Sequence, residues 1–223
     1  MISICIPCYE MHGKGQIYLK ILLESILIQS TNKYEVVISD QSDNVDILNL
    51  IDSYKSKMDI SYYKCDNKGK SSYNLNNAIK HAKYDIIKPM FQDDFFINNI
   101  CLESILNIPN VTWGGCIFTH FDSDNNHIGN TISPIYNVNI KRGINTIGGP
   151  SVVFFKNDKN FFNNELVWLM DCEFYEKMFK KYGSFLNVAL CGIGVRVWND
   201  SYTNHITEEI KNKEFNIVKE LYG

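Results

Sequence analysis

Short apolar runs of strand length alternate with segments of helical spacing through the first half of the chain. The runs that predict strands cover residues 2–6, 35–39, 60–65 and 86–91, and the helical patterns between them cover 16–30, 45–54 and 71–82. Ser71 or Ser72 would cap the third of these helices. Strands that alternate with helices form βαβ units, so we expect an α/β fold with a mostly parallel sheet and helices on both faces.

The second half of the chain has a less regular pattern. Its extended segments are 111–119, 128–133, 152–156 and 185–189, and its helical segments are 166–182 and the polar segment from 207 onward. Gly148, Gly149 and Pro150 interrupt the chain between them. There is no internal repeat and no low-complexity linker, and 223 residues suit one domain, so we expect a single domain over residues 1–223.

Polar clusters follow the ends of three predicted strands. They are residues 7–10, Asp40, and the group Gln92, Asp93 and Asp94. Because ligands bind beyond the carboxyl ends of strands in such sheets, we expect these clusters to lie in one crevice. Two adjacent carboxylates after a buried strand need a compensating charge, which a divalent cation bound to phosphate oxygens would supply. The alternative is that both acids cap a helix or lie in a solvated turn.

Composition and charge exclude several classes of protein. A formal net charge of −3 with no basic block argues against nucleic acid as the main partner. The chain starts directly with a strand-like segment and shows no signal peptide, and its longest apolar stretch, 21–28, is broken by Glu24 and too short to cross a bilayer. Seven cysteines without a framework indicate reduced thiols, so we expect a cytoplasmic protein.

Cys5 and Cys8 have the spacing of a dithiol redox site, which is an alternative function to be weighed. Such sites open a helix, whereas here Cys5 would be buried in a strand and the next helix starts only near Gln16. A zinc site would need a second pair of ligands at suitable spacing, and the sequence has none.

The order and spacing of several motifs resemble family 2 glycosyltransferases with the GT-A fold. The segments that carry the resemblance are 4–10, 35–40, 67–72, 91–94, 148–151 and 168–174. It covers nearly the whole chain and implies a Rossmann-like central sheet with a smaller acceptor-side region. Residues 1–97 would then form a nucleotide-sugar-binding half, and residues 98–223 an acceptor-binding half.

The resemblance also implies roles for individual residues. The donor-binding candidates are Pro7, Tyr9, Glu10, Asp40, Asn67, Gly69, Lys70, Gln92 and Asp93. The acceptor-binding candidates are Gly149, Pro150, Trp168 and Glu173. Asp94 would bind Mn²⁺ or Mg²⁺ with His205 as a further ligand, and Asp171 would be the general base. Gln92 stands at the first position of the D-x-D motif, and Met170 replaces the glutamate usual before the base.

These assignments imply inverting transfer of a sugar from a nucleotide diphosphate to a hydroxyl of a saccharide or glycan. The cation would neutralise the leaving diphosphate, and Asp171 would accept the proton of the attacking hydroxyl. Asp171 has a weaker rival in Glu165, and it could instead be a helix N-terminal acid. Trp168 could pack in the core, Glu173 and His205 could be structural, and Arg196 could pair a phosphate or lie in solvated surface.

Two other functions remain open at this stage. A nucleotidyltransferase shares a related sheet and acid pair, and Gly13, Lys14 and Gly15 are a thin version of its phosphate loop. A non-catalytic sugar-binding or nucleotide-binding module would have kept the fold without the base. A lipid-linked acceptor would bring the protein into peripheral contact with a membrane, for which no anchor is visible.

Overall fold

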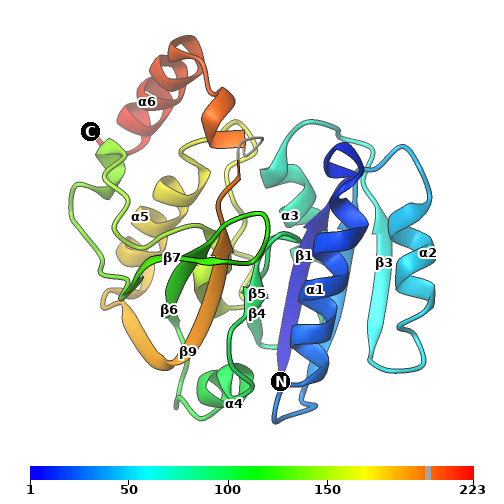
Figure 1. The fold of residues 1–223 in the computed structure, drawn as a ribbon. Coiled ribbons are helices and arrows are strands. Elements are labelled where there is room, and N and C mark those ends of the chain that lie inside the picture. The colour runs from blue at the N-terminus through cyan, green and yellow to red at the C-terminus, as the bar shows by residue number, and fades with distance from the viewer. Residues whose placement is uncertain (199–201) are drawn as a thin grey trace.

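The computed structural model describes residues 1–198 and 202–223. In these residues the strands form one nine-stranded sheet in the order β3-β2-β1-β4-β8-β6-β9-β5, with β7 paired to β6 (Figure 1). The strands are β1 Ile2–Cys8, β2 Tyr34–Asp40, β3 Ile60–Lys64, β4 Ile86–Pro89, β5 Phe95–Phe96, β6 Trp113–Phe121, β7 His127–Ile132, β8 Val153–Lys156 and β9 Leu186–Arg196. The α-helices are α1 Gly15–Leu27, α2 Asp46–Asp52, α3 Ser71–His81, α4 Cys101–Leu106, α5 Met170–Tyr182 and α6 Glu208–Tyr222.

The first four strands form one parallel block of the sheet, and β6 and β9 form a second parallel pair. All seven residues of β1 are buried, which is typical of a parallel strand covered on both faces. β1 pairs with β2 on one side and with β4 on the other, so Cys8 lies opposite Asp40 and Cys5 lies opposite Pro89. This register brings the carboxyl ends of β1, β2 and β4 to the same edge of the sheet.

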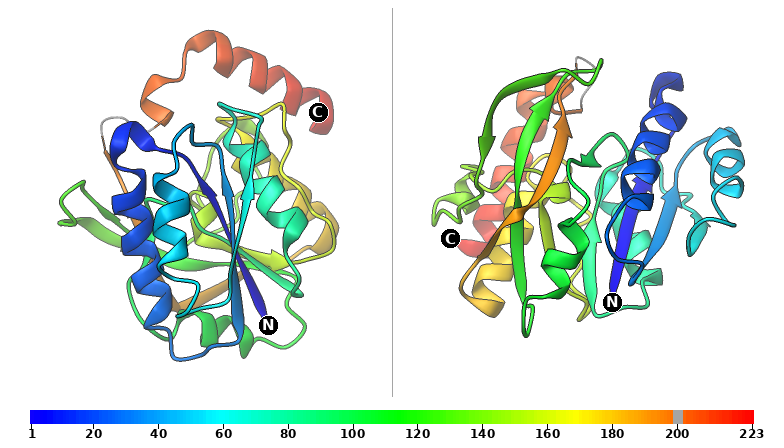
Figure 2. Two further views of the ribbon diagram at one scale, coloured as in Figure 1. Left: turned by 90° about the vertical axis from the view of Figure 1, so that its right-hand side faces the viewer. Right: turned by 60° about the horizontal axis from the view of Figure 1, so that its bottom comes forward.

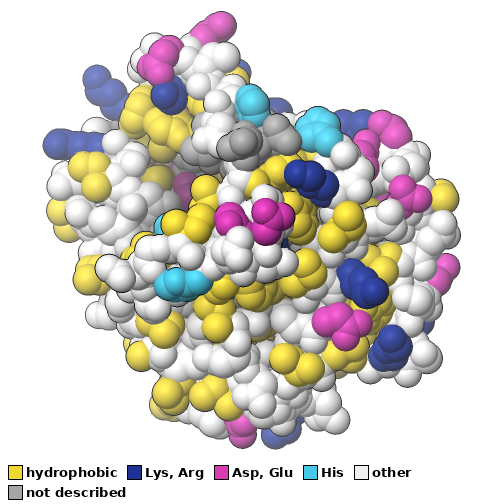
Figure 3. Space-filling view, in the orientation of Figure 1, with side chains coloured by type: hydrophobic (Ala, Val, Ile, Leu, Met, Phe, Trp, Pro, Cys, Tyr) yellow, Lys and Arg dark blue, Asp and Glu magenta, His cyan; other side chains and the backbone are white. Residues whose placement is uncertain are grey.

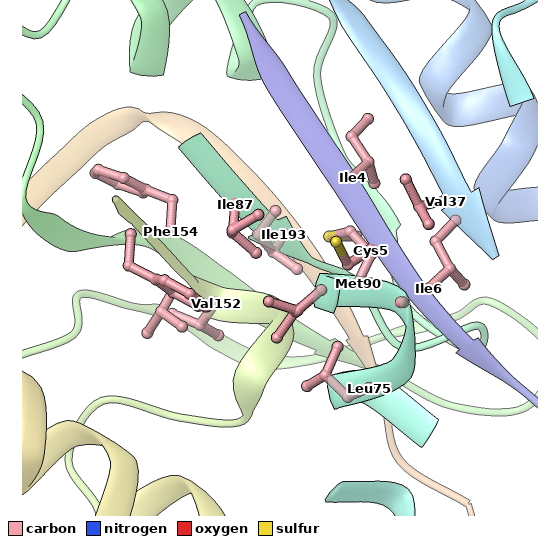
Figure 4. Packing of buried hydrophobic residues seen from close by; sticks show 14 of the residues in the cluster. Ile4, Cys5, Ile6, Val37, Leu75, Ile87, Met90, Val152, Phe154 and Ile193 are labelled. Atoms are coloured by element: carbon pink, nitrogen blue, oxygen red, sulfur yellow. The ribbon is translucent and has the colours of Figure 1, made fainter. Parts of the chain in front are cut away.

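Helices cover the parallel strands on both faces. α1 and α2 lie together on one face, and α3 lies on the other (Figure 2). One continuous apolar cluster extends from β1 through β4 and β8 to α5 and β9. Figure 4 shows part of it, including Ile4 of β1, Ile87 of β4 and Leu75 of α3. The predicted fold class, α/β with a mixed, mostly parallel sheet and helices, is confirmed.

The second half of the sheet differs from the prediction in three places. β5 and α4 were not predicted from the sequence. The last strand was predicted to end at residue 189, whereas β9 continues to Arg196. Gly194 explains part of this error, because a Cβ there would lie 2.5 Å from the ring of Phe95 in β5. The glycine therefore permits close packing between paired strands rather than ending the strand.

The cysteines and the helices bear on two alternatives, a dithiol redox site and a membrane-spanning segment. All seven cysteines are free and buried, and burial raises the pKa of the Cys5 and Cys8 thiols well above the usual range, which makes them poor nucleophiles. Among the described residues, each helix is too short or too polar to span a membrane.

Candidate active site

A cleft of about 800 Å³ opens at the carboxyl edge of the parallel strands. All but three of the predicted site residues line it: Pro7, Tyr9, Glu10, Gly69, Lys70, Gln92, Asp93, Asp94, Gly149, Pro150, Trp168, Asp171 and His205. The face drawn in Figure 3 carries histidine and basic side chains along its upper part, between α6 and the top of α1. The two halves of the chain therefore contribute to one concave surface.

Asp40 is one of the three predicted residues that lie outside the cleft. Its side chain is fully buried, and its Oδ1 accepts hydrogen bonds from the backbone N–H and the hydroxyl of Ser42, at 2.9 and 2.6 Å. Its Oδ2 accepts from the Tyr62 hydroxyl at 2.9 Å. These contacts satisfy the carboxylate inside the protein, so Asp40 is not among the residues that line the cleft, and its role in donor binding stays a prediction.

Asn67 and Glu173 also lie outside the cleft. The backbone carbonyl of Asn67 accepts a hydrogen bond from Gln41, which itself lines the cleft beside Gly69. Glu173 is 3% exposed and accepts a hydrogen bond of 2.6 Å from the Tyr222 hydroxyl of α6. Glu173 thus connects two helices, as expected if it is structural, and the acceptor contact stays an untested prediction.

Gln92 joins the end of β4 to the loop after β1. The backbone N–H of Tyr9 donates to Gln92 Oε1 at 2.6 Å, and Gln92 Nε2 donates to the Tyr9 carbonyl at 2.9 Å. The oxygen and the nitrogen of the buried Gln92 amide therefore both bond the backbone of Tyr9. Gln92, at the first position of the motif, therefore holds the backbone of the first loop at Tyr9, whereas Asp93 and Asp94 also line the cleft.

Gly15, the first residue of α1, packs closely against this pair. A Cβ at Gly15 would lie 2.3 Å from the Tyr9 carbonyl oxygen and 2.9 Å from Gln92 Nε2. We expect Gly15→Ala to lower the free energy of unfolding by roughly 1–3 kcal/mol, the usual range for overpacking. Chemical denaturation measures it, with Gly149→Ala as the control because a Cβ there meets nothing within 4 Å. Equal losses in the two variants would contradict this steric explanation.

Asp93 and Asp94 are held from the end of β9. The backbone N–H of Arg196 donates to Asp94 Oδ1 at 3.0 Å, and the indole N–H of Trp198 donates to Asp93 Oδ2 at 3.2 Å. The Arg196 Nε also donates to the Asp93 carbonyl at 3.0 Å. Burial, with a smaller contribution from the charge of Asp93, raises the pKa of Asp94 to about 7, and burial raises the pKa of Asp93 as well.

Arg196 and Trp198 also line the cleft, which no motif in the sequence indicates. Arg196 is 4% exposed, and its guanidinium lies 4.4 Å from the ring centroid of Tyr18. In the sequence, Arg196 is an isolated cation and Trp198 belongs to no recognisable motif. The one local signal is that a cation and an aromatic residue follow a strand-like segment, which is a common pattern.

The acid pair fits a hard divalent cation. Carboxylate oxygens are suitable ligands for Mg²⁺ or Mn²⁺, and the raised pKa of Asp94 reflects buried negative charge that a cation would offset. Among residues 1–198 and 202–223, no three His, Cys, Asp or Glu side chains lie close enough to hold a metal alone. A cation here would need oxygens from a ligand such as a diphosphate. His205 also lines the cleft.

Asp171 lies across the cleft, near the start of α5. Its carboxylate accepts hydrogen bonds from the Cys172 backbone N–H at 2.7 Å and from Asn145 Nδ2 at 2.8 Å. Burial raises the pKa of Asp171 to about 6. A carboxylate with this pKa is largely ionised near pH 7 and still basic enough to accept a proton. Asn145, which the sequence analysis missed, orients the carboxylate from the loop before Gly148.

The loop before α3 forms another wall of the cleft. Gly69 has a φ of +78°, which favours glycine, and Lys70 donates to the Asn164 carbonyl at 3.2 Å. Lys68 pairs with Asp43, and both line the cleft although neither was predicted. Because Asp43 offsets the charge of Lys68, Lys70 is the cation of this loop that an anionic ligand in the cleft would meet.

These features define an α/β protein with a strand-edge cleft in which an acid pair and a separate carboxylate face one ligand space. A family model described as "Glycosyl transferase family 2" matches residues 3–202. The chain therefore belongs to glycosyl transferase family 2. The comparison with curated proteins finds no match.

Solved structures with a similar fold include TarS of S. aureus and a mannosyltransferase. For TarS the TM-score is 0.64 at 17% identity, over 96% of this chain and 43% of that chain. For a TarS fragment, "1-349 in complex with UDP-GlcNAc", the TM-score is 0.69 at 14% identity, over 97% of this chain and 66% of that chain. For the mannosyltransferase PcManGT from Pyrobaculum calidifontis "in complex with GDP-Man and Mn2+", the TM-score is 0.64 at 15% identity, over 90% of this chain and 58% of that chain. The chain spans less than half of the first of these.

Proposed function

We propose that this protein is an inverting, metal-dependent glycosyltransferase. It moves a sugar from a nucleotide diphosphate to a hydroxyl group of a saccharide or glycan. The observation that carries the proposal is that Asp93, Asp94 and Asp171 line one cleft although they come from different halves of the chain. Family membership supports the reaction class, and the similar structures include one complex with UDP-GlcNAc and one with GDP-Man.

The residues of the cleft would divide the reaction between them. Asp94, with Asp93 and His205 nearby, would hold Mn²⁺ or Mg²⁺, which when bound stabilises the charge of the leaving diphosphate. Pro7, Tyr9 and the loop around Gly69 would bind the nucleotide. Asp171 would accept the proton of the acceptor hydroxyl as its oxygen attacks the anomeric carbon, and attack from the side opposite the diphosphate inverts that centre.

A cytoplasmic location is part of this proposal. All seven cysteines are free, which suits a reducing compartment, and nucleotide-sugars would be the donors there. Contact with a membrane would be peripheral, through a lipid-linked acceptor.

The reaction can be tested directly with two donors. UDP-GlcNAc and GDP-mannose are each incubated with the protein and a panel of saccharide acceptors, with Mn²⁺ or with EDTA, and release of nucleoside diphosphate is measured. One donor should give release that depends on both the acceptor and the metal. A nucleotidyltransferase would instead release pyrophosphate from a nucleoside triphosphate and a sugar phosphate, and that result would refute the proposal.

The pH dependence follows from the raised pKa of Asp171. The base acts in its ionised form, and burial shifts its pKa upward from 3.8 to about 6. We therefore expect kcat to fall as the pH drops through about 6, with a tenfold loss per pH unit below it. The measurement is kcat between pH 5 and 8 at saturating donor and Mn²⁺. A rate that stays level down to pH 5 would contradict the base assignment.

A further inference from the structure

The C-terminal helix α6 lies outside residues 3–202, the part of the chain that the family model matches. One of its side chains nevertheless reaches the start of α5. Glu214 is 2% exposed, and its carboxylate accepts hydrogen bonds from three successive backbone N–H groups, those of Val167, Trp168 and Leu169, at 2.8, 3.0 and 2.7 Å. Hydrogen bonds to a charged acceptor are strong, so these three fix both the Glu214 side chain and the backbone of residues 167–169.

The amides of Val167 and Trp168 lie in the turn just before α5, and that of Leu169 lies at its N-cap position, so Glu214 binds the entry to a helix that has no side-chain cap of its own. Leu169 occupies the N-cap position, and its side chain makes no capping hydrogen bond. The first N–H groups of a helix have no partner inside the helix, and a negative charge is favourable there. Glu214 supplies both the acceptor oxygens and the charge from a different helix, so the start of α5 depends on α6 for its position.

The segment that Glu214 holds carries two residues of the cleft. Asp171 follows the last bonded amide by two residues, and Trp168 donates one of the three hydrogen bonds. α6 also contacts the Trp168 side chain: the ring of Phe215 lies 5.3 Å away in edge contact, and the Lys211 ammonium lies 5.7 Å from the centre of the indole ring. One helix thereby fixes the backbone before Asp171 and the orientation of Trp168.

We propose that Glu214 is a positioning residue for Asp171 and Trp168, and that α6 forms part of the acceptor side of the catalytic site. The inference rests on the proposed glycosyl transfer and adds to it an element that the family match does not include. The donor side of the cleft comes from β1, β4 and the loop before α3. Glu214 should therefore influence transfer to the acceptor without influencing the binding of the nucleotide.

The test compares Glu214→Gln with Tyr222→Phe. The glutamine keeps the size of the side chain but loses the charge and one acceptor oxygen. Tyr222 lies at the other end of α6, where its hydroxyl donates to Glu173 of α5 at 2.6 Å, so its removal weakens helix docking without touching residues 167–169. We expect Glu214→Gln to lower kcat by roughly 10²-fold, the effect of a small misplacement of a reacting group. Tyr222→Phe should keep the wild-type kcat.

Binding of UDP or GDP with Mn²⁺, measured by calorimetry, should give the wild-type Kd in both variants. Loss of nucleotide binding in Glu214→Gln, or an equal fall of kcat in Tyr222→Phe, would overturn the proposal and leave α6 a structural element only. If Glu214→Gln does not fold, Glu214→Asp keeps the charge on a shorter side chain and must lower kcat at unchanged Kd; a wild-type kcat would overturn the proposal. A wild-type protein that transfers no sugar would instead refute the proposed function.

Discussion

Asp171→Asn should lower the rate of sugar transfer by about 10²–10⁴-fold, the usual contribution of a general base. The amide has the shape of the carboxylate, and its oxygen can still accept the hydrogen bond of 2.7 Å from the Cys172 N–H, although the one from Asn145 Nδ2 is lost. The variant should therefore fold like the wild type and bind the donor with an unchanged Kd. What it loses is the group that accepts the proton of the acceptor hydroxyl.

The matched control for this experiment is Glu165→Gln. Glu165 is exposed, lies five residues before the start of α5 and does not line the cleft, although it was the weaker candidate for the base. Glu165→Gln should therefore keep the wild-type rate of sugar transfer. Initial rates at saturating donor and acceptor, with nucleotide Kd from calorimetry, separate chemistry from binding. Full turnover by Asp171→Asn would mean that another group accepts the proton.

Asp94→Asn should remove the dependence of donor binding on Mn²⁺ and lower transfer by about 10²–10³-fold, the range for loss of one electrostatic contact to a developing charge. The asparagine can still accept from the Arg196 N–H, so the end of β4 should keep its position. It cannot provide the negative charge that holds a divalent cation. In the wild type, EDTA should produce a comparable loss of activity.

The control variant is Asp124→Asn, which removes an exposed carboxylate on the turn between β6 and β7, outside the cleft. It should bind nucleoside diphosphate more tightly in the presence of Mn²⁺, as the wild type does. Were Asp94→Asn to keep this metal dependence, the cation would have to bind elsewhere, and the role of the acid pair would need another explanation.

The sequence was most informative about residues whose position follows from chain order. Asp93 and Asp94 come directly after a buried strand, and parallel strands end at the same edge of a sheet, so their place in the cleft could be predicted. The same reasoning did not predict that the Asp40 carboxylate would be buried among other side chains, outside the lining of the cleft. A strand end locates the backbone, but the direction of the side chain depends on nearby partners, here Ser42 and Tyr62.

The contacts that the sequence could not predict join residues far apart in the chain. The hydrogen bond from Arg196 to Asp94 spans 102 positions, and the one from Trp168 to Glu214 spans 46. Neither contact produces a local pattern of polar and apolar residues. The second half of β9 was missed for a related reason, because Gly192 and Gly194 resemble strand breakers until Ile97 and Phe95 are seen to pack against them.

The central claim is that Asp94 holds a divalent cation in the cleft where the diphosphate of the donor binds. The most direct measurement is anomalous diffraction from crystals grown with Mn²⁺ and UDP or GDP. If Asp94 holds the cation, a manganese peak should lie about 2.0–2.6 Å from one of its carboxylate oxygens, with diphosphate oxygens completing the coordination. A diphosphate bound in the cleft with no manganese at Asp94, or manganese bound away from the cleft, would contradict it.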